Sequence, residues 1–281
     1  MIAGARGSSG RMKSVAMHAV LIIASTVILG PFLWIAVASL RTQISLMMGE
    51  VSFTPTMINF DELLFSSGSN YLANYANSLF VAAATTVIVL TVSTMAAYSL
   101  ARLKWPRWMV HLILLWAIVF HMIPPITLVG AWFATLRIVG LDSSYTGLIL
   151  AHVTLNIPMA LWMMTIYVRD VPLELEEAAR MDGATTTVLL WKVIVPLVAP
   201  GLVATGILVF IFSWNEFAVA LNLTSRQTAT IPVAIASFAQ EYVIKHTTMA
   251  AAATLSVIPA LVLLLVGQRY IVKGLLTGAI K

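Results

Sequence analysis

The segment Glu177-Ala-Ala-Arg-Met-Asp-Gly183, which continues through Lys192-Val-Ile-Val-Pro196, is a charged interruption in a very hydrophobic chain. Between Arg169 and Asp182 the sequence carries five acidic and two basic residues. Apolar stretches lie on both sides, and charged side chains are too costly to expose to lipid. We therefore expect this segment to form a polar helical loop at the membrane surface, where it faces a partner.

The composition is that of a polytopic membrane protein. Of 281 residues, 60% are hydrophobic and only 10% are charged, whereas soluble domains carry roughly 25% charged residues. The chain has no cysteine, which excludes a disulfide framework and a thiolate metal site. The net charge of +5 does not indicate nucleic-acid binding, because basic residues collect at the cytoplasmic edge of membrane proteins.

Runs without charged residues locate the membrane-spanning helices. A bilayer core of about 30 Å needs roughly 20 helical residues. Adjusted to that length, the runs predict six helices over residues 15–38, 76–99, 110–133, 146–167, 200–222 and 248–268. The runs lack the alternation of a membrane barrel, so the predicted fold class is an all-α bundle of six transmembrane helices.

The distribution of basic residues predicts the orientation. With the N-terminus in the cytoplasm, twelve of the 16 Lys and Arg residues fall on the inner side and four on the outer side. The outer four are Arg41, Arg137, Arg226 and Lys245. Both termini (1–14 and 268–281) and the loop at 169–198 are then cytoplasmic. Ala36-Val-Ala38 resembles a signal cleavage site, but the apolar run before it is longer than that of a signal peptide, so we expect an uncleaved first helix.

Prolines occur in the predicted third, fourth, fifth and sixth helices, which favours a bundle with bends and a cavity over a simple anchor. They are Pro124, Pro125, Pro158, Pro200 and Pro259. His121 has no second ligand at metal-binding spacing, so we interpret it as a hydrogen-bonded interior residue and expect no metal site. Asn74 and Asn77 are interpreted as caps at the start of the second helix.

Trp214-Asn215-Glu216 is the sharpest polar signal inside a predicted span. Glu216 lies about 16 residues, or about 24 Å, beyond the expected start of the fifth helix, in the outer part of the membrane. It is either an interfacial Glu near the helix end or a polar position near the outer mouth of a pathway. The aromatic ring and the amide also suit sugar recognition. Asn156 of the fourth helix is included in this candidate pathway.

The charged loop itself contains the signals of two short helices. Asp170 is predicted to cap the first helix, with Pro172 in its first turn. Three glutamates, Glu174, Glu176 and Glu177, follow near the positive end of the helix dipole. Gly183 is expected to end this helix in the left-handed conformation. A second helix is predicted from about Thr185 to Val195, ending at Pro196, while Ala178 and Ala179 leave a small surface that a partner can approach closely.

The loop resembles the EAA loop of ABC importer permeases. That motif consists of Glu-Ala-Ala, three residues, Gly, nine residues and Ile-x-Leu-Pro, and Val193 and Val195 are the conservative departures here. The stretches Ala97–Leu103, Phe212–Phe217 and Gln268–Lys281 are similar to the carbohydrate-type branch, within it to the second, six-helix permease subunit of maltose importers.

This resemblance implies a type I importer bundle with a five-helix core at 72–267. It also implies a second permease subunit, two ATP-binding subunits, and a solute-binding protein outside the bacterial inner membrane. The loop would couple to the ATPase through Glu174, Glu177, Ala178, Ala179, Asp182, Gly183 and Pro196, and the tail at Lys273–Lys281 would reach the same interface. The chain lacks the phosphate-binding Gly-x-x-x-x-Gly-Lys-Ser/Thr pattern, so ATP and Mg²⁺ are expected on the partner and no catalytic residue in this chain.

Three alternatives stay open at this point. The same architecture imports other solutes, such as glycerol phosphate or a polyol. A channel or an ion-coupled carrier would need ionisable residues in mid-membrane and internal repeats, for which only Glu216 and His121 are candidates. An intramembrane enzyme would need a set of catalytic residues, which is not evident in the sequence.

Overall fold

The computed structural model describes residues 7–239 and 244–278 and shows only helices and their connections in these ranges. The predicted all-α class is therefore confirmed. The described residues divide into two compact units. One draws on Met1–Ser69 and Ser237–Val257, and the other on Asn70–Ala236 and Ile258–Lys281.

The first unit contains one long apolar helix and three shorter ones. They are α1 (Gly7–Ser39), α2 (Gln43–Met47), α3 (Ile58–Phe65) and α14 (His246–Ser256). Helix α14 packs against α1 and α3. The α3 side chain of Asn59 donates hydrogen bonds to the carbonyl oxygens of Ser39 and Arg41, each at 2.7 Å, which fixes the chain after α1. Most apolar side chains of α1 are exposed, as lipid contact requires.

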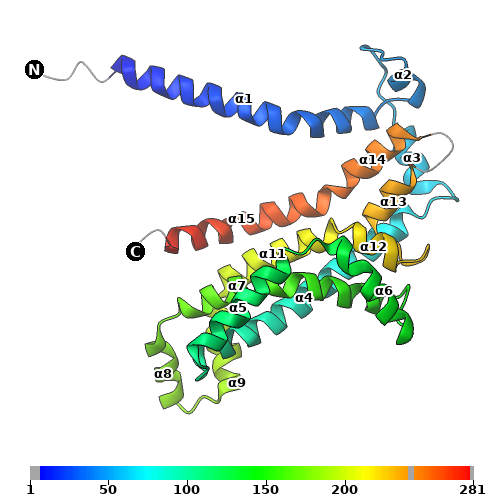
Figure 1. Cartoon of the computed structure of the whole chain (residues 1–281). Coiled ribbons are helices and arrows are strands. Elements are labelled where there is room, and N and C mark those ends of the chain that lie inside the picture. The colour runs from blue at the N-terminus through cyan, green and yellow to red at the C-terminus, as the bar shows by residue number, and fades with distance from the viewer. Residues whose placement is uncertain (1–6, 240–243, 279–281) are drawn as a thin grey trace, which may run out of the picture. The chain divides into compact units, whose positions relative to one another are not determined.

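The second unit contains the rest of the described helices (Figure 1). They are α4 (Tyr71–Arg102), α5 (Arg107–His121), η1 (Pro125–Leu128), α6 (Val129–Ile138), α7 (Tyr145–Arg169), α8 (Leu173–Met181), α9 (Thr186–Val188), η2 (Leu189–Ile194), α10 (Val195–Leu197), α11 (Ala199–Trp214), α12 (Ala218–Leu223), α13 (Ile231–Ser237) and α15 (Ile258–Gly278).

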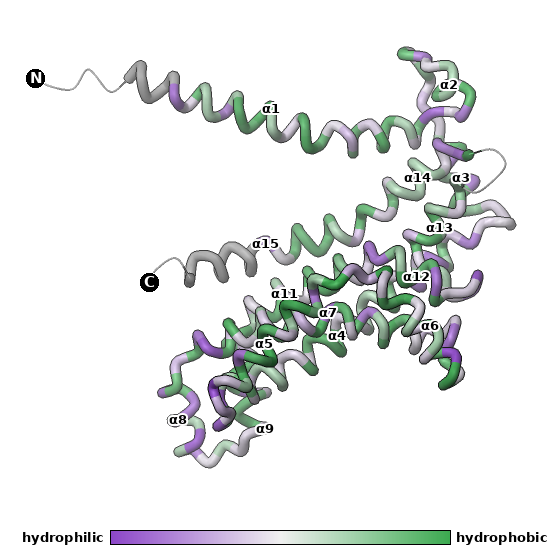
Figure 2. The backbone as a smooth tube through the Cα atoms, viewed as in Figure 1, coloured by the Kyte–Doolittle hydropathy of each residue, from purple (hydrophilic) through white to green (hydrophobic). Residues whose placement is uncertain are grey.

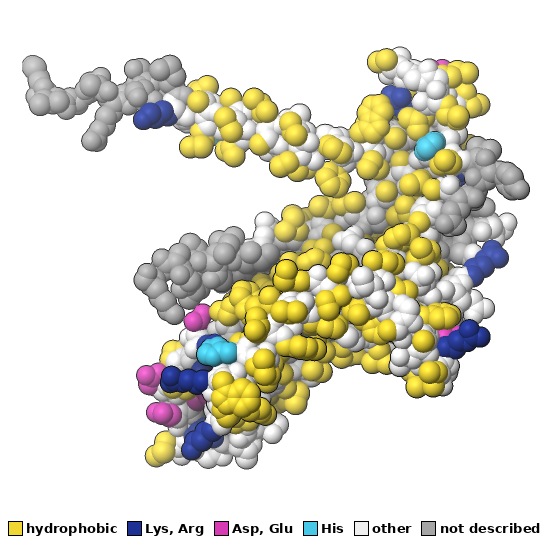
Figure 3. Space-filling view, in the orientation of Figure 1, with side chains coloured by type: hydrophobic (Ala, Val, Ile, Leu, Met, Phe, Trp, Pro, Cys, Tyr) yellow, Lys and Arg dark blue, Asp and Glu magenta, His cyan; other side chains and the backbone are white. Residues whose placement is uncertain are grey.

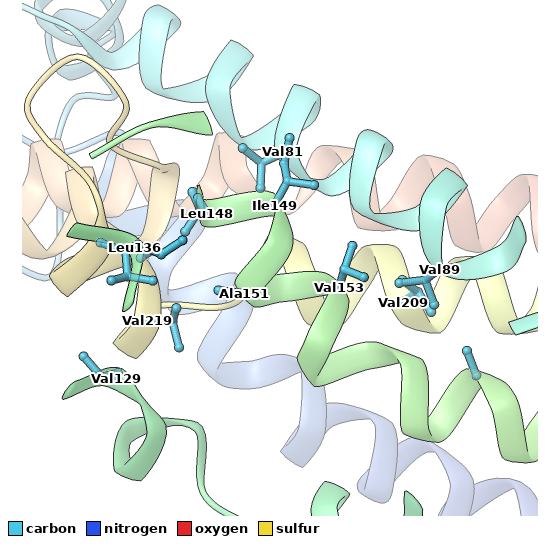
Figure 4. Close-up of a cluster of buried hydrophobic side chains, with 13 residues drawn as sticks. Val81, Val89, Val129, Leu136, Leu148, Ile149, Ala151, Val153, Val209 and Val219 are labelled. Carbon is cyan, nitrogen blue, oxygen red and sulfur yellow. The ribbon is translucent and has the colours of Figure 1, made fainter. Parts of the chain in front are cut away.

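Helix α7 is central to this unit, because it packs against α4, α5 and α11. Helix α11 also packs against α4 and α15. Valine, leucine, isoleucine and alanine side chains from α4, α6, α7, α11 and α12 form a buried cluster between these helices (Figure 4). Small and branched side chains let the backbones approach closely, which is the packing that stabilises helices in a membrane.

Four helical stretches in the described ranges are long and apolar enough to cross a membrane. They are Lys13–Ser39, Tyr71–Arg102, Tyr145–Arg169 and His246–Gln268. Two sharply bent helix pairs bring the number to as many as six, if each pair is one span. The colouring of Figure 2 shows apolar residues along these helices and polar residues at α8. The chain is thus a multi-pass membrane protein.

The predicted third helix, 110–133, is not continuous. Helix α5 ends at His121, and the chain turns by 97° before Pro125–Ile138. Pro124 and Pro125 explain the break, because proline lacks the amide proton that helix continuation needs. Pro158 has no such effect, since α7 runs through it from Tyr145 to Arg169.

The predicted fifth helix, 200–222, is also wrong in its extent. Helix α11 ends at Trp214, and α12 starts at Ala218 after a break of three residues. This break contains no proline or glycine, so local propensity gives no sign of it. The predicted caps Asn74 and Asn77 lie inside α4, which begins at Tyr71, so that interpretation is wrong as well.

Candidate functional site

The charged loop connects α7 to α11 and begins with α8. Asp170 is the C-cap of α7, and the position before α8 is occupied by Pro172, which makes no side-chain cap hydrogen bond. The prediction that Asp170 caps α8 is therefore wrong. Proline suits this position because its fixed φ is compatible with entry into a helix and its missing N–H would have been unpaired there.

Gly183 ends α8 as predicted. Its φ is +83°, in the left-handed region that favours glycine. The amide of Ala184 donates to the carbonyl of Ala179 at 3.0 Å, and the amide of Asp182 donates to that of Ala178 at 3.1 Å. These bonds satisfy carbonyls that the end of a helix would otherwise leave free. The chain thereby reverses direction within a few residues.

The second half of the loop is helical from Thr186 to Leu197 and then bends by 79° into α11. Thr185 caps it by accepting a hydrogen bond from the amide of Val188. The stretch Leu189–Ile194 is π-helical, a rare form that is frequent at functional sites. Pro196 lies in the last helical turn and is exposed, so the helix ends one residue after the predicted stop.

Helix α8 presents two different faces. The predicted coupling residues Glu174, Glu177 and Ala178 are exposed, as are Asp182 and Gly183 beyond its end. Figure 3 shows acidic and basic side chains gathered at the end of the unit where α8 lies, with hydrophobic side chains covering the helices beyond it.

The opposite face of α8 is held against the helix bundle. Ala179 is half-buried and packs against a cluster of buried apolar side chains beneath the loop. This cluster includes Leu189, Ile194 and Met164, which are completely buried. The predicted coupling residue Ala179 therefore belongs to the inner side of the loop, whereas its neighbour Ala178 is on the outer side.

Charged side chains also anchor the inner face. Glu176 has a side chain only 5% exposed, and it forms an ion pair with Arg102 at the end of α4. Arg180 donates a hydrogen bond to the hydroxyl of the buried Tyr98, also on α4, at 3.3 Å. Of the consecutive residues Glu176 and Glu177, one is therefore buried in an ion pair and the other is open to a partner.

Three of the four candidate pathway residues, Trp214, Asn215 and Glu216, lie at the end of α11 and in the break after it. The ring of Trp214 is buried, stacks on Phe210 with centroids 5.9 Å apart, and forms a T-shaped contact with the ring of Tyr75, with centroids 5.4 Å apart. Asn215 is exposed, and its side-chain amide donates to the carbonyl of Ile211 at 2.9 Å. Asn156 is buried in α7 and donates to the carbonyl of His152 at 2.8 Å.

Glu216 has a specific structural environment in this break. Its carboxylate accepts hydrogen bonds from the amides of Val219 and Ala220 at 2.9 Å each, at the start of α12. It also faces His152 of α7, whose other ring nitrogen lies 2.7 Å from the hydroxyl of Ser213. The carboxylate thus caps α12, and among the four candidate pathway residues only Asn215 has an exposed side chain.

Sequence reasoning did not identify the inner partners of the site. Arg102 is predicted only as a basic residue at the inner membrane edge, and no role is predicted for His152. The signal for Arg102 is weak in sequence, because its partner Glu176 is 74 residues away. His121, predicted as an interior residue, is exposed beside Phe212, with ring centroids 6.4 Å apart. The described residues contain no group of three or more potential metal ligands.

The fold and the loop define a class: a multi-pass helical membrane protein with a polar two-helix loop at one end of its bundle. Residues 93–277 match the family model described as the binding-protein-dependent transport system inner membrane component. The match covers more than half of the chain, and the protein belongs to this family.

Relatives support the same assignment over most of the chain. It is 40% identical to the trehalose transport system permease protein SugB of Mycobacterium tuberculosis, over 89% of this chain and 92% of that protein. It is 33% identical to the trehalose/maltose transport system permease protein MalG of Thermococcus litoralis, over 92% of this chain and 94% of that protein.

A solved structure shows the same fold. The chain is similar to a chain from the crystal structure of a bacterial ABC transporter involved in the import of the acidic polysaccharide alginate. The TM-score is 0.78 at 23% sequence identity, and the match covers 96% of this chain and all of the other. The predicted ABC importer permease fold is confirmed, and the family match and the relatives identify the chain as a permease subunit.

Proposed function

We propose that this chain forms part of the translocation pathway of an ATP-driven, solute-binding-protein-dependent importer of a disaccharide or oligosaccharide. In this proposal α8 docks on a partner ATPase subunit, with Glu174, Glu177, Ala178, Asp182 and Gly183 at the contact. Ala179 supports the loop by packing against the buried cluster beneath it, and Pro196 lies in the last helical turn of the loop.

The observation that carries the docking proposal is the inverted polarity of α8. Glu176 is buried, whereas Leu175 is 45% exposed and Met181 is 88% exposed. An ordinary amphipathic surface helix buries its leucine and methionine side chains and exposes its carboxylates. Exposed apolar side chains next to exposed Glu174 and Glu177 suit a protein partner with an apolar cleft and a basic rim.

We propose the rest of the assembly from the family to which the chain belongs. We infer that both termini and the α8 loop are cytoplasmic, because the loops on that side hold most of the basic residues. A second permease subunit, two ATP-binding subunits and an external solute-binding protein complete the importer. ATP and Mg²⁺ bind to the ATP-binding subunits, which supply the hydrolysis chemistry. The predicted tail at Lys273–Lys281 ends outside the described residues, which stop at Gly278.

The sugar class rests on the relatives. Two of them are permeases of trehalose or of trehalose and maltose transport systems, and a third, at 28% identity, belongs to a diacetylchitobiose uptake system of Streptomyces coelicolor. Glycerol phosphate or a polyol is the alternative substrate for the same architecture. We propose the disaccharide class because these relatives cover nearly all of the chain.

The docking proposal is tested by reversing one charge in α8, which follows α7, and one charge in the connection before α7. Glu177→Arg places a cation on the exposed face of α8, and we expect it to reduce co-purification of the ATP-binding subunit at least tenfold. Asp142→Arg makes the same change in the exposed connection before α7, about 37 Å away along this 25-residue helix. It should leave co-purification unchanged. Equal losses, or no loss for Glu177→Arg, would contradict the proposal.

The substrate proposal is tested with the assembled importer in vesicles. Uptake of labelled trehalose and maltose is measured with ATP inside or outside the vesicles, alongside labelled glycerol phosphate and sorbitol. We expect ATP-dependent uptake of a disaccharide and none of the other two solutes. Uptake restricted to glycerol phosphate or sorbitol would replace the sugar assignment, and uptake without ATP-binding subunits would support a carrier.

A further inference from the structure

Arg102 is the last residue of α4, and its guanidinium joins three consecutive parts of the chain. It forms the ion pair with Glu176 of α8. It also donates hydrogen bonds to the carbonyl of Val168, in the last turn of α7, at 2.8 Å, and to that of Val171, in the connection to α8, at 2.6 Å. One side chain therefore fixes the end of α7, the start of the loop and α8 against α4.

A second contact, between Arg180 and Tyr98, fixes the orientation of α8 on α4. Tyr98 and Arg102 are four residues apart on α4, and Glu176 and Arg180 are four residues apart on α8. Residues with this spacing lie on the same side of a helix. Because Arg180 donates to the Tyr98 hydroxyl, the two helices are held at two points, one turn apart, which resists rotation as well as separation.

The buried ion pair between Arg102 and Glu176, which we call the clamp, is unusual for an element that only stabilises a fold. The side chains of Arg102 and Glu176 are only 8% and 5% exposed. A buried ion pair carries a large desolvation cost, and apolar side chains of similar size often stabilise a protein as well or better. What the pair provides is a defined geometry, because the rigid planar guanidinium of arginine holds several acceptors at once.

Helix α4 extends from this clamp to the other candidate site. Its 32 residues span about 48 Å, and Tyr75, in its first turns, contacts the ring of Trp214 at 5.4 Å. The same helix therefore contacts the ATPase-docking helix at one end and the break after α11 at the other.

We propose that Arg102 and Glu176 are positioning residues that transmit displacement of α8 to α4, so that movement of a docked ATPase reaches the candidate pathway. The exposed Glu177 contacts the ATPase, whereas the buried Glu176 links that contact to the bundle. This inference rests on the proposed function, because it assumes that α8 docks on an ATP-binding subunit.

The first test separates coupling from assembly. In the complete importer, Glu176→Gln removes the negative charge while it leaves the outer face of α8 intact. We expect normal co-purification of the ATP-binding subunit, continued ATP hydrolysis, and at least a tenfold loss in solute imported per ATP hydrolysed. Arg102→Lys keeps the charge but loses the planar fork, and should show a smaller loss. Lys104→Gln, at an exposed position two residues beyond Arg102, is the matched control and should equal the wild type.

The second test replaces the clamp with a covalent link. The chain has no cysteine, so Arg102→Cys combined with Glu176→Cys introduces the only two thiols of this subunit. We expect the unlinked pair to lose coupling and a short bifunctional thiol reagent to restore it. The single variant Glu176→Cys, treated with the same reagent, should stay uncoupled. This test also decides the question if Glu176→Gln fails to accumulate.

The outcomes distinguish failure of this inference from failure of the proposed function. Wild-type protein that neither binds an ATP-binding subunit nor imports solute would overturn the proposed function. If the wild-type importer assembles and imports solute, but Glu176→Gln and Arg102→Lys keep the normal ratio of solute imported to ATP hydrolysed, this inference alone would be overturned. A linked pair that stays uncoupled while the importer remains assembled would do the same.

Discussion

The Nε2 atom of His152, in the first third of α7, lies 3.6 Å from the Oε2 atom of Glu216, in the break between α11 and α12. The His152 side chain is 1% exposed and that of Glu216 is 10% exposed. The carboxylate also caps α12 through the amides of Val219 and Ala220. Glu216 therefore connects two helices of the bundle and fixes where α12 begins.

This relationship separates the two interpretations of Glu216. If the carboxylate acts as a cap, Glu216→Ala should lower the free energy of unfolding by about 1–2 kcal/mol, the usual cost of losing a helix cap. Thermal unfolding of the purified importer measures this loss. The KM for solute uptake should stay within about twofold of the wild type, because the side chain faces protein rather than a pathway.

Asn215→Ala is the control for this prediction. Asn215 is exposed, and its side chain donates only to the carbonyl of Ile211 within its own helix. We expect little change in stability. If Glu216→Ala were as stable as the wild type but raised the KM strongly, Glu216 would instead belong to the solute pathway.

The close approach of α11 to α7 provides a second prediction. A Cβ atom at Gly201 would lie 2.3 Å from Cγ of Tyr167, and a backbone shift would be needed to relieve this contact. We expect Gly201→Ala to lower the free energy of unfolding by about 1–3 kcal/mol, as overpacking does. Reduced thermal stability and yield of the purified subunit are the measurements.

Gly206 offers a matched position on the same helix. A Cβ atom there would lie 3.1 Å from Cδ1 of Leu90, the mobile end of a side chain. Gly206→Ala should therefore cost less than Gly201→Ala. Adding Tyr167→Ala to Gly201→Ala removes the clashing ring and should recover part of the lost stability. An equal cost at both glycines would show that this crossing is not limited by the Tyr167 ring.

Gly183 is the subject of a third prediction, because its constraint is conformational rather than steric. A Cβ atom would meet nothing within 4 Å, but the φ of +83° is unfavourable for other residues. Gly183→Ala should destabilise the loop by about 1 kcal/mol and lower the affinity for the ATP-binding subunit about fivefold, while Gly183→Asn should have a smaller effect because asparagine tolerates this region. Titration of the importer with the ATP-binding subunit measures the affinity.

The control is another glycine in the left-handed region, outside the loop. Gly140 has a φ of +71° and also has open space around it, but it lies between α6 and α7. Gly140→Ala should cost similar stability and leave the affinity for the ATP-binding subunit unchanged. If both variants weakened binding equally, the effect would come from general destabilisation and not from the geometry of α8.

The sequence predicted the elements whose signals are local. Charge-free runs located the spans to within a few residues at α7, and Gly183 marked the end of α8 because few other residues adopt its backbone conformation. The motif spacing located the loop. These features depend on neighbours along the chain, so they can be read without the fold.

Features that depend on distant partners could not be predicted. Nothing local distinguishes Glu176 from Glu177, since the difference is made by Arg102 on another helix. The break after Trp214 has no proline or glycine. The carboxylate of Glu216, which caps α12, faces His152, which lies 64 residues earlier in the chain. Propensity and hydropathy extended the helix through this point, because they contain no information on tertiary contacts.

Asn77 shows the same dependence and supports a fourth prediction. Its side-chain amide donates to the carbonyls of Gln227 and Ala229, both at 2.9 Å, and its oxygen accepts from the hydroxyl of Tyr145 at 2.8 Å. Asn77→Ala would remove these three part-buried hydrogen bonds, at a cost of about 1–3 kcal/mol in total. We expect faster hydrogen exchange in residues 225–231, measured by mass spectrometry, and a smaller effect for Tyr145→Phe.

A matched asparagine tests whether this effect is specific. The side chain of Asn222 is exposed and donates to the carbonyl of Ala218 in its own helix, so Asn222→Ala should leave exchange in residues 225–231 unchanged. The side chain of Ser78 also accepts a hydrogen bond from the amide of Ile231 at 2.7 Å. The C-terminal end of residues 225–231 should therefore remain protected from exchange in Asn77→Ala. If exchange in Asn77→Ala were uniform over residues 225–231, or no faster than in the wild type, Asn77 would not be the residue that holds this segment to α4.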